Sequence, residues 1–169
     1  MRQIKVNSLL GNEIITLGDV KNYVRIDSDD DNAIITNMIT QARIWCENYI
    51  SRDIVPKNRT YYLGETSGLF DLPFAPVATI VSVTVEGEAA TYTEYGLDDL
   101  SIELDGGPSS NVKVTYTTSG LNDGLIKQAL LQMVSNLYDN RADFVTGTIV
   151  SQIPTNVKSI LSGYKTMFI

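Results

Sequence analysis

The chain has 169 residues, of which 43% are hydrophobic and 20% charged, a composition typical of a folded domain with one sizeable core. It contains no histidine and a single cysteine, Cys46, which excludes histidine-based catalysis, internal disulfides and cysteine zinc sites. The net charge of −7 argues against a protein that grips DNA phosphates. We find no signal peptide and no apolar run near the ~18 residues that span a bilayer, and expect a non-membrane protein made in a reducing cytoplasm.

The first part of the chain is predicted to be helical. The segment "TLGDVKNYVRI" begins with Thr16 as an N-cap and Asp19 three residues later, which is a capping-box pattern. A longer helix is predicted from about Asp30 to Tyr49. Its apolar stripe has i, i+3, i+4 spacing and consists of Ile35, Met38, Ile39, Ala42, Trp45, Cys46 and Tyr49.

The middle of the chain has the pattern of β-strands. Short β-branched and aromatic runs such as "RTYYL", "TIVSVTVEG" and "NVKVTYTT" are separated by Gly, Pro, Asn and Ser. Apolar residues alternate at Val81, Val83 and Val85, and again at Val112, Val114 and Tyr116. This pattern predicts a small antiparallel sheet.

A second long helix is predicted after the sheet, with Asp123 as its N-cap. Its apolar stripe comprises Leu125, Ile126, Ala129, Leu130, Met133, Val134, Leu137 and Tyr138. We therefore predict an α+β fold in which a small helical core, two long helices with shorter ones, is interrupted by an antiparallel β insertion. The predicted parts are an N-terminal helical part over residues 1–58, the β insertion over 59–118, the second long helix over 119–141, and a C-terminal arm with a short helix over 142–169.

Each pattern that could indicate a chemical site is better explained by a structural role. The run "DSDDDN" places Asp27, Asp29 and Asp31 at calcium-loop positions, but the diagnostic glycine and glutamate are Asn32 and Met38. We interpret the run as a cap for the following helix.

Cys46 lies in an apolar stripe and is interpreted as a buried structural thiol. The turn "DGGP" lacks the context of a phosphate-binding loop, and neighbouring carboxylates such as Asp98 and Asp99 do not converge. We expect no catalytic residue, cofactor or metal.

Two stretches resemble the head–tail connector, or adaptor, family of tailed phages. The first is "ITLGDVKNYVRIDSDDDNAIITNMITQARIWCENYISRDIV", with a Thr-Leu helix start, a "YVRID" segment, an acidic run and a helix ending in "ENY". The second is "LIKQALLQMVSNLYDNRADFVTGTIVSQIPTNVKSIL", which carries "KQA", "NR" and "IP" in the order of the family's C-terminal half. The segment "DLPFAPVATIVSVTV" is similar to the start of the β insertion in longer members.

The resemblance implies a structural role in the virion neck, at the head–tail interface. Members form a ring, typically of twelve copies, beneath the portal protein. The ring extends the DNA channel and is the docking platform for the next neck or tail protein, a stopper or a tail terminator. DNA would pass without specific binding, which agrees with an acidic chain. We expect the β insertion to be a contact module, because an open sheet edge can pair with another chain.

Two alternatives remain open at this point. One is a different neck or tail-completion protein with a similar helical core. The other is a phage accessory enzyme or metal-dependent protein, which would need convergent carboxylates that the sequence does not display.

The last residues of the chain are predicted to form an assembly arm from about Asp143 to Ile169. A short helix starting near Pro154 is marginal alone in water, and exposed apolar residues beyond it would favour aggregation. We expect the arm to dock on the portal and the adjacent subunit and the domain to stay folded without it; the alternative is that it folds back on its own subunit. The predicted interface residues are Phe144, Val145, Ile149, Val150, Ile153, Pro154, Val157, Ile160, Leu161, Tyr164, Met167, Phe168 and Ile169.

Overall fold

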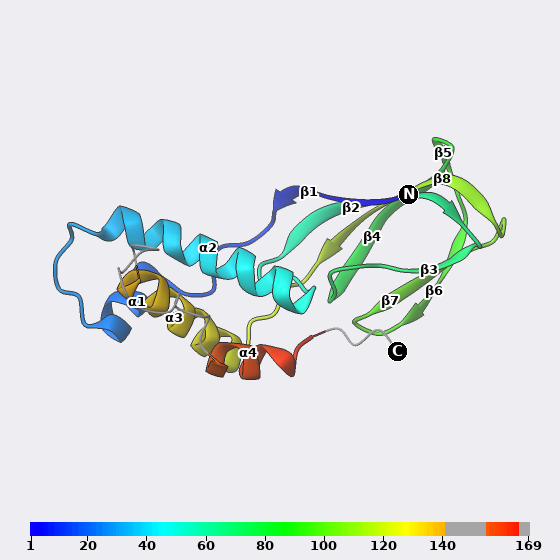
Figure 1. The fold of residues 1–169 in the computed structure, drawn as a ribbon. Helices are drawn as coiled ribbons and strands as arrows, with labels where there is room; N and C mark the ends of the chain where they lie inside the picture. Colours follow the sequence, from blue (N-terminus) through cyan, green and yellow to red (C-terminus); the bar gives the residue numbers. More distant parts are fainter. Residues whose placement is uncertain (141–154, 166–169) are drawn as a thin grey trace. The chain divides into compact units, whose positions relative to one another are not determined.

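The structure is a computed structural model that describes residues 1–140 and 155–165 (Figure 1). The chain forms two compact units, each built from two separate stretches of sequence. The sheet unit comprises Met1–Asn12 and Ser51–Leu121, and the helical unit comprises Glu13–Ile50 and Asn122–Ile169. Helices and antiparallel sheets together confirm the predicted α+β class. No helix in the described part of the chain is long and apolar enough to cross a membrane.

Four helices form the described part of the helical unit: α1 (Leu17–Val24), α2 (Asn32–Ile50), α3 (Gly124–Asp139) and α4 (Thr155–Ser162). The Thr16 capping box is confirmed, because the Thr16 side chain accepts from the Asp19 backbone and the Asp19 carboxylate accepts from the Thr16 backbone. Asp123 is confirmed as the N-cap of α3, where its carboxylate accepts from the Leu125 backbone N–H at 2.7 Å.

The core of the helical unit follows the predicted stripes closely. On α2 the buried apolar residues are Ile35, Ile39, Ala42, Cys46 and Ile50, and on α3 they are Ile126, Ala129, Leu130, Met133 and Val134. Leu125 differs from the prediction, because it lies at the margin of the stripe in the first turn of α3 and remains exposed.

Helix α4 completes this core. Val157 and Leu161 are fully buried, and α4 packs against both α3 and α2. The described part of the C-terminal segment therefore folds back on its own helical unit. Removing α4 would delete two core side chains, so the expectation that the domain stays intact without this segment does not fit the structure.

Eight strands form the sheet unit: β1 (Arg2–Leu9), β2 (Lys57–Thr66), β3 (Leu69–Asp71), β4 (Val77–Val85), β5 (Glu88–Ala89), β6 (Tyr92–Gly96), β7 (Leu100–Leu104) and β8 (Ser109–Thr118). The larger sheet has the order β1-β2-β8-β4-β5 and the smaller sheet has the order β3-β7-β6. All pairs are antiparallel. Both sheets contribute buried residues to one core, including Leu63, Val112, Val114 and Tyr116 from the larger sheet and Phe70, Ile102 and Leu104 from the smaller one.

The predicted alternation is confirmed on β8 and interrupted on β4. Val112, Val114 and Tyr116 are all fully buried. On β4 the register shifts between Ile80 and Ser82, so the bulge places Val81 outside the regular pairing, and Val81 is exposed although Val83 is buried.

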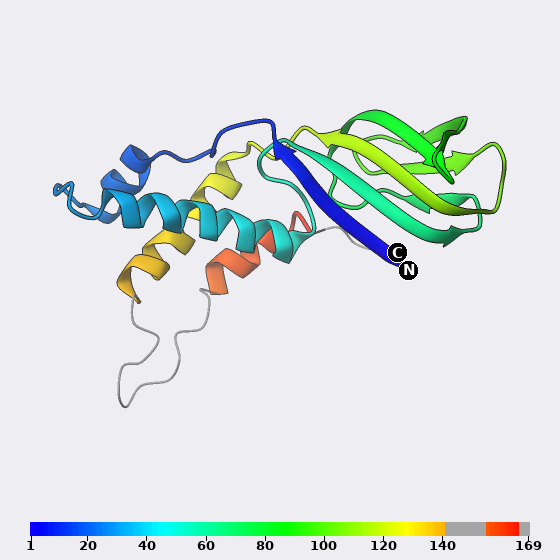
Figure 2. The same cartoon turned by 90° about the horizontal axis from the view of Figure 1, so that it is seen from above.

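The N-terminal boundary also differs from the prediction of a helical part over residues 1–58. Residues 2–9 form β1, the outermost strand of the larger sheet, and residues from Ser51 onward belong to the sheet unit. Figure 2 shows β1 running along β2 at the margin of the sheet. The partner strand begins far along the chain at Lys57, so the local sequence could not reveal this pairing.

A buried ion cluster, the Asp53 cluster, consists of Asp53, Lys57, Arg59 and Thr118. The Asp53 carboxylate accepts from Lys57 Nζ at 2.9 Å, from Arg59 Nε and Nη2 at 2.7 and 2.6 Å, and from Thr118 Oγ1 at 2.8 Å. Asp53 is fully buried, which by itself raises its pKa, but the hydrogen bonds and charges of Arg59 and Lys57 outweigh burial and lower the pKa below its ordinary value.

The cluster lies where the chain enters and leaves the sheet unit. The Leu10 backbone donates to the Pro56 carbonyl at 2.8 Å, and the Leu121 backbone donates to the Ile54 carbonyl at 3.0 Å. Gly120 has φ +74°, and a Cβ there would lie only 2.6 Å from the Ile54 oxygen, so a side chain cannot be accommodated. Two of the three connections to the helical unit are therefore hydrogen-bonded to residues 54 and 56. The third connection, at Ile50–Ser51, continues directly into the same segment.

We predict that Asp53→Asn lowers the free energy of unfolding of the sheet unit by about 3–5 kcal/mol, because it leaves two buried cations without their carboxylate. The carboxylate stabilises the fold fully above its unfolded pKa of about 3.9, and this stabilisation is lost as pH falls through the lowered folded pKa. The two proteins should therefore differ at neutral pH and converge in acid. Urea-dependent hydrogen exchange of β2 and β8 amides measures this. The exposed Asp105→Asn is the control, and equal stability of all three proteins at pH 7 would contradict the prediction.

We also predict that Leu161→Ala destabilises the helical unit by about 2–5 kcal/mol, because it opens a cavity at a fully buried position. The single tryptophan, Trp45 on α2, reports unfolding of this unit by fluorescence in urea. Lys158→Ala on the exposed side of the same helix should change stability little. If Leu161→Ala behaves like the control, α4 is not part of the core.

Candidate functional site

The predicted interface residues of the C-terminal segment fall into two groups. Phe144, Val145, Ile149, Val150, Ile153, Pro154, Met167, Phe168 and Ile169 lie outside the described residues. The remaining four lie on or just after α4, where Val157 and Leu161 are in the core, and Ile160 and Tyr164 are half-buried. The core pair is therefore occupied within its own unit and cannot at the same time contact a partner.

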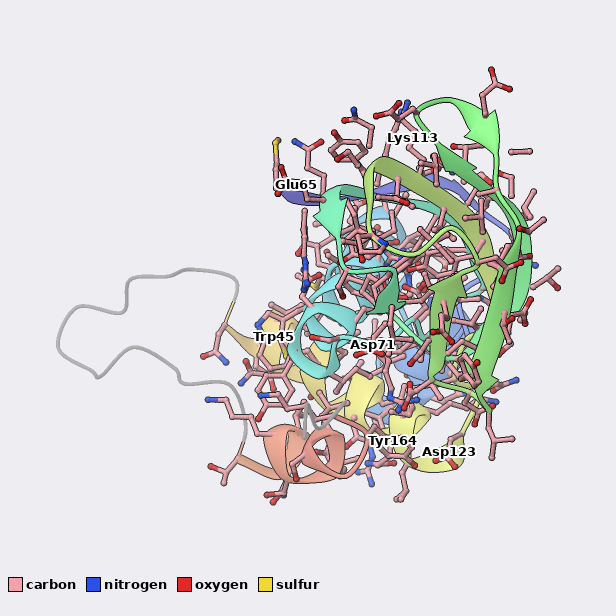
Figure 3. All side chains as sticks on the ribbon, turned by 90° about the vertical axis from the view of Figure 1, so that its right-hand side faces the viewer. Trp45, Glu65, Asp71, Lys113, Asp123 and Tyr164 are labelled. Atoms are coloured by element: carbon pink, nitrogen blue, oxygen red, sulfur yellow. The ribbon has the colours of Figure 1, made fainter. Side chains whose placement is uncertain are left out.

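Tyr164 fixes the end of α4 to the start of α3 (Figure 3). Its hydroxyl donates to the Asp123 carboxylate at 2.7 Å, the same carboxylate that caps α3. This hydrogen bond raises the pKa of Tyr164 to about 12 and helps to lower the pKa of Asp123. The ammonium of Lys165 also lies 5.3 Å from the ring centre of Tyr49 on α2. These contacts hold the described end of the chain on its own helices.

A second buried ion network connects α2 to the residue that opens the helical unit. Arg43 Nε donates to both carboxylate oxygens of Glu13, at 2.9 and 2.8 Å, and Arg43 Nη1 donates to Glu47 at 2.8 Å. Arg43 and Glu47 are buried and one helical turn apart. This network was not predicted from the sequence, although the i, i+4 spacing of Arg43 and Glu47 indicates half of it.

The acidic run before α2 makes local polar contacts. Asp29 pairs with Lys21 at 2.7 Å and accepts from the Asn32 side chain, which together lower its pKa. The Asp31 backbone carbonyl accepts from the Ile35 N–H, as expected of the residue that precedes the helix, and its carboxylate accepts from the Tyr138 hydroxyl at 2.6 Å. In residues 1–140 and 155–165, no three Cys, Asp or Glu side chains are grouped to hold a metal ion.

The single thiol does not form a reactive site. Cys46 is fully buried in the helical core, and burial followed by the charge of Glu47 raises its pKa to about 12. A thiol with so high a pKa is protonated at neutral pH and is a poor nucleophile.

The candidate site is instead a surface, formed by strand β1 and the sheet behind it. All eight residues of β1 are exposed, and its outer edge faces no neighbouring strand in the larger sheet. Ile4, Val6, Leu9 and Leu10 are apolar and between 36% and 54% exposed. A long open strand edge with exposed apolar residues is a place where another chain can add on.

The outer face of the larger sheet carries a groove beside β1. The groove has a volume of about 710 Å³ and is lined by Gln3, Ile4, Lys5, Asn7, Thr60, Tyr62 and Lys113. Its wall is organised by side-chain hydrogen bonds, since the Asn7 amide donates to Asn58 and Thr60, at 2.7 and 2.9 Å. The residues offer hydroxyl, amide and ammonium groups, which suit recognition of a polar surface.

Chains with a similar fold occur in solved structures of gene transfer agent particles. The chain is similar to a chain in the neck of an empty gene transfer agent (GTA) particle computed with C6 symmetry, with a TM-score of 0.76, and to one in the native GTA virion, with a TM-score of 0.77. A third similar chain belongs to the native GTA neck computed with C12 symmetry, with a TM-score of 0.75. Each is 15% identical, and each match covers 99% of this chain and 97% of the other. No curated protein matches the chain.

A family model described as "Phage gp6-like head-tail connector protein" matches residues 14–103, which is more than half of the chain. The match runs from the start of the helical unit through α1 and α2 and most of the sheet unit, so it includes elements of both units. The chain is therefore a structural protein and not an enzyme, and it belongs to the phage gp6-like head–tail connector family.

Proposed function

We propose that the chain is a head–tail adaptor that forms a ring under the portal protein of a tailed phage. In this proposal the ring extends the DNA channel and is the docking platform for a stopper or tail terminator. The observation that carries the proposal is the connector-family match over residues 14–103. Similar chains in GTA necks computed with C6 and C12 symmetry support a ring, with twelve copies as the expected number.

The exposed strand β1 supports a role that depends on assembly. All residues of β1 are exposed, and a partner that covered its apolar side chains would remove apolar surface from water. A ring repeats one head-to-tail contact around its axis, so every subunit must offer two different surfaces. The edge of β1 is one candidate for such a surface.

Contacts with the portal are proposed for the C-terminal residues outside the described ranges, from Phe144 to Pro154 and from Met167 to Ile169. Helix α4 would fix the position of these segments on the subunit, because it is anchored in the helical core through Val157 and Leu161. These two residues are therefore removed from the proposed interface. Ile160 and Tyr164 remain candidates through their exposed parts.

The test of the proposed function is the position of the protein in a particle. We expect electron microscopy of particles that carry the chain with a small rigid N-terminal tag to find tag density in a ring directly beneath the portal. A band further down the neck would favour a different neck or tail-completion protein and overturn the adaptor assignment. Absence of the chain from particles that have joined tails would also overturn it.

We further predict that the free protein does not retain double-stranded DNA at physiological salt. Thirteen basic residues stand against twenty acidic ones, so binding would release few counterions from the phosphates. A gel-shift titration at micromolar protein measures this, with a basic DNA-binding domain as the positive control. A shift that persists at physiological salt would be inconsistent with a channel along which the genome slides.

A further inference from the structure

We infer that neighbouring copies of the chain contact each other through two opposite faces of the sheet unit, one carrying only lysines and the other only carboxylates. The inference rests on the proposed ring and specifies the contact that would build it. The first face, the lysine face, is the outer surface of the larger sheet. The second, the carboxylate face, is the outer surface of the smaller sheet.

The strand register identifies which residues make up the lysine face. Residues that pair across neighbouring strands share a face, and the residues that alternate with the buried set of β2 and β8 point outward. By register, this outward set comprises Gln3, Lys5 and Ser8 on β1, Asn58, Thr60 and Tyr62 on β2, Lys113, Thr115 and Thr117 on β8, and Thr79, Ser82 and Thr84 on β4. Asn7 and Asn111 belong to the same face because their side chains are hydrogen-bonded to Asn58, Thr60 and Tyr62. In a chain of net charge −7, the only charged side chains in this set are two lysines.

The polar side chains of this face hold one another in place, but the lysines are not paired. The Thr60 and Thr115 hydroxyls are 3.2 Å apart, and the Tyr62 hydroxyl donates to the Asn111 amide oxygen at 2.7 Å. Lys5 and Lys113 line the groove, and neither forms an ion pair with any residue in the described ranges. Their positive charge is available to a partner.

The carboxylate face has the opposite character. The residues that alternate with Phe70, Ile102 and Leu104 form two cross-strand rows on the smaller sheet: Leu69, Glu103 and Thr93 in one, and Asp71, Ser101 and Tyr95 in the other. The Tyr95 hydroxyl donates to Glu103 at 2.8 Å and the Ser101 hydroxyl donates to Asp71 at 2.6 Å, which orients both carboxylates. Neither carboxylate has a cationic partner among the described side chains. Leu69 and Tyr95 add exposed apolar and aromatic surface.

The two faces point away from each other because the common core lies between the sheets. In Figure 3, Lys113 lies at the top of the sheet unit and Asp71 lies well below it. A contact between the lysine face of one copy and the carboxylate face of the next uses two different surfaces, so it repeats head to tail and closes into a ring when the rotation permits.

The charges predict a contact of fixed direction that is weak between two free subunits. Exposed ion pairs are individually weak and are screened by salt, and they determine orientation and partner choice more than affinity. Two like faces repel, so the same charges disfavour back-to-back dimers that would block ring closure. When the contact is repeated around a ring held on a portal, the overall affinity would be higher than that of the single contact between two free subunits.

A charge-reversal experiment tests the contact. Lys5→Glu with Lys113→Glu makes both faces acidic, and Asp71→Lys with Glu103→Lys makes both faces basic. Each variant alone should join portal-bearing heads at least about tenfold less efficiently than the natural chain. A one-to-one mixture should recover incorporation by alternating around the ring, and the chain with all four substitutions should assemble alone. Incorporation is measured by quantitative gel analysis of purified particles and by ring density in electron micrographs.

The matched control reverses the same number of charges on the same unit but away from both faces. Glu65→Lys on β2 with Glu88→Lys on β5 should leave incorporation unchanged, because both residues are exposed but share the register of the inward-facing set and not of the lysine face. All substituted positions are exposed, so circular dichroism and thermal unfolding should match the natural chain.

The outcomes separate the inference from the proposed function. Normal incorporation of either face variant, or no recovery in the mixture, overturns the inference while leaving the adaptor role intact. Unchanged rings with impaired DNA passage in the lysine-face variant would place that face along the channel, and this also overturns the inference. Failure of the natural chain to reach the neck counts against the proposed function itself.

Discussion

The sheet unit depends on one buried carboxylate. The Asp53 carboxylate is hydrogen-bonded to two buried cations and to the threonine at the end of β8. The same short segment accepts backbone hydrogen bonds from the two other points where the chain enters or leaves the unit. Buried ions add little net stability when paired, but they tolerate few geometries. We interpret the cluster as a clamp that fixes where three connections meet.

Such a clamp matters for a subunit that functions through its surfaces. The common core fixes the two outer faces and the edge of β1 within one compact unit, so the unit can present several surfaces in a constant orientation. The helical unit is fixed in a comparable way by the Arg43 network and by α4. A connector has no catalytic centre to organise, and its buried polar groups maintain shape.

Features set by neighbouring residues could be predicted from the sequence, and features set by distant ones could not. The Thr16 and Asp123 caps and the alternation along β8 are local, and all three are present. Strand β1 escaped prediction because its partner is distant in the chain, and the bulge at Val81 arises from pairing with β8. The Asp53 cluster looks like ordinary solvated charge in the segment "RDIVPKNR", because only the folded chain brings Thr118 against it.

The interleaving of the two units has a consequence for synthesis on the ribosome. β1 emerges first, yet Leu9 pairs with Lys57, so the strand waits until α1 and α2 have followed it out. Those helices in turn wait for α3, which emerges only after the whole sheet. Neither unit can fold vectorially as a contiguous segment, and such non-local closure is intrinsically slow. Nascent chains therefore expose apolar surface until the distant partner elements have been synthesised.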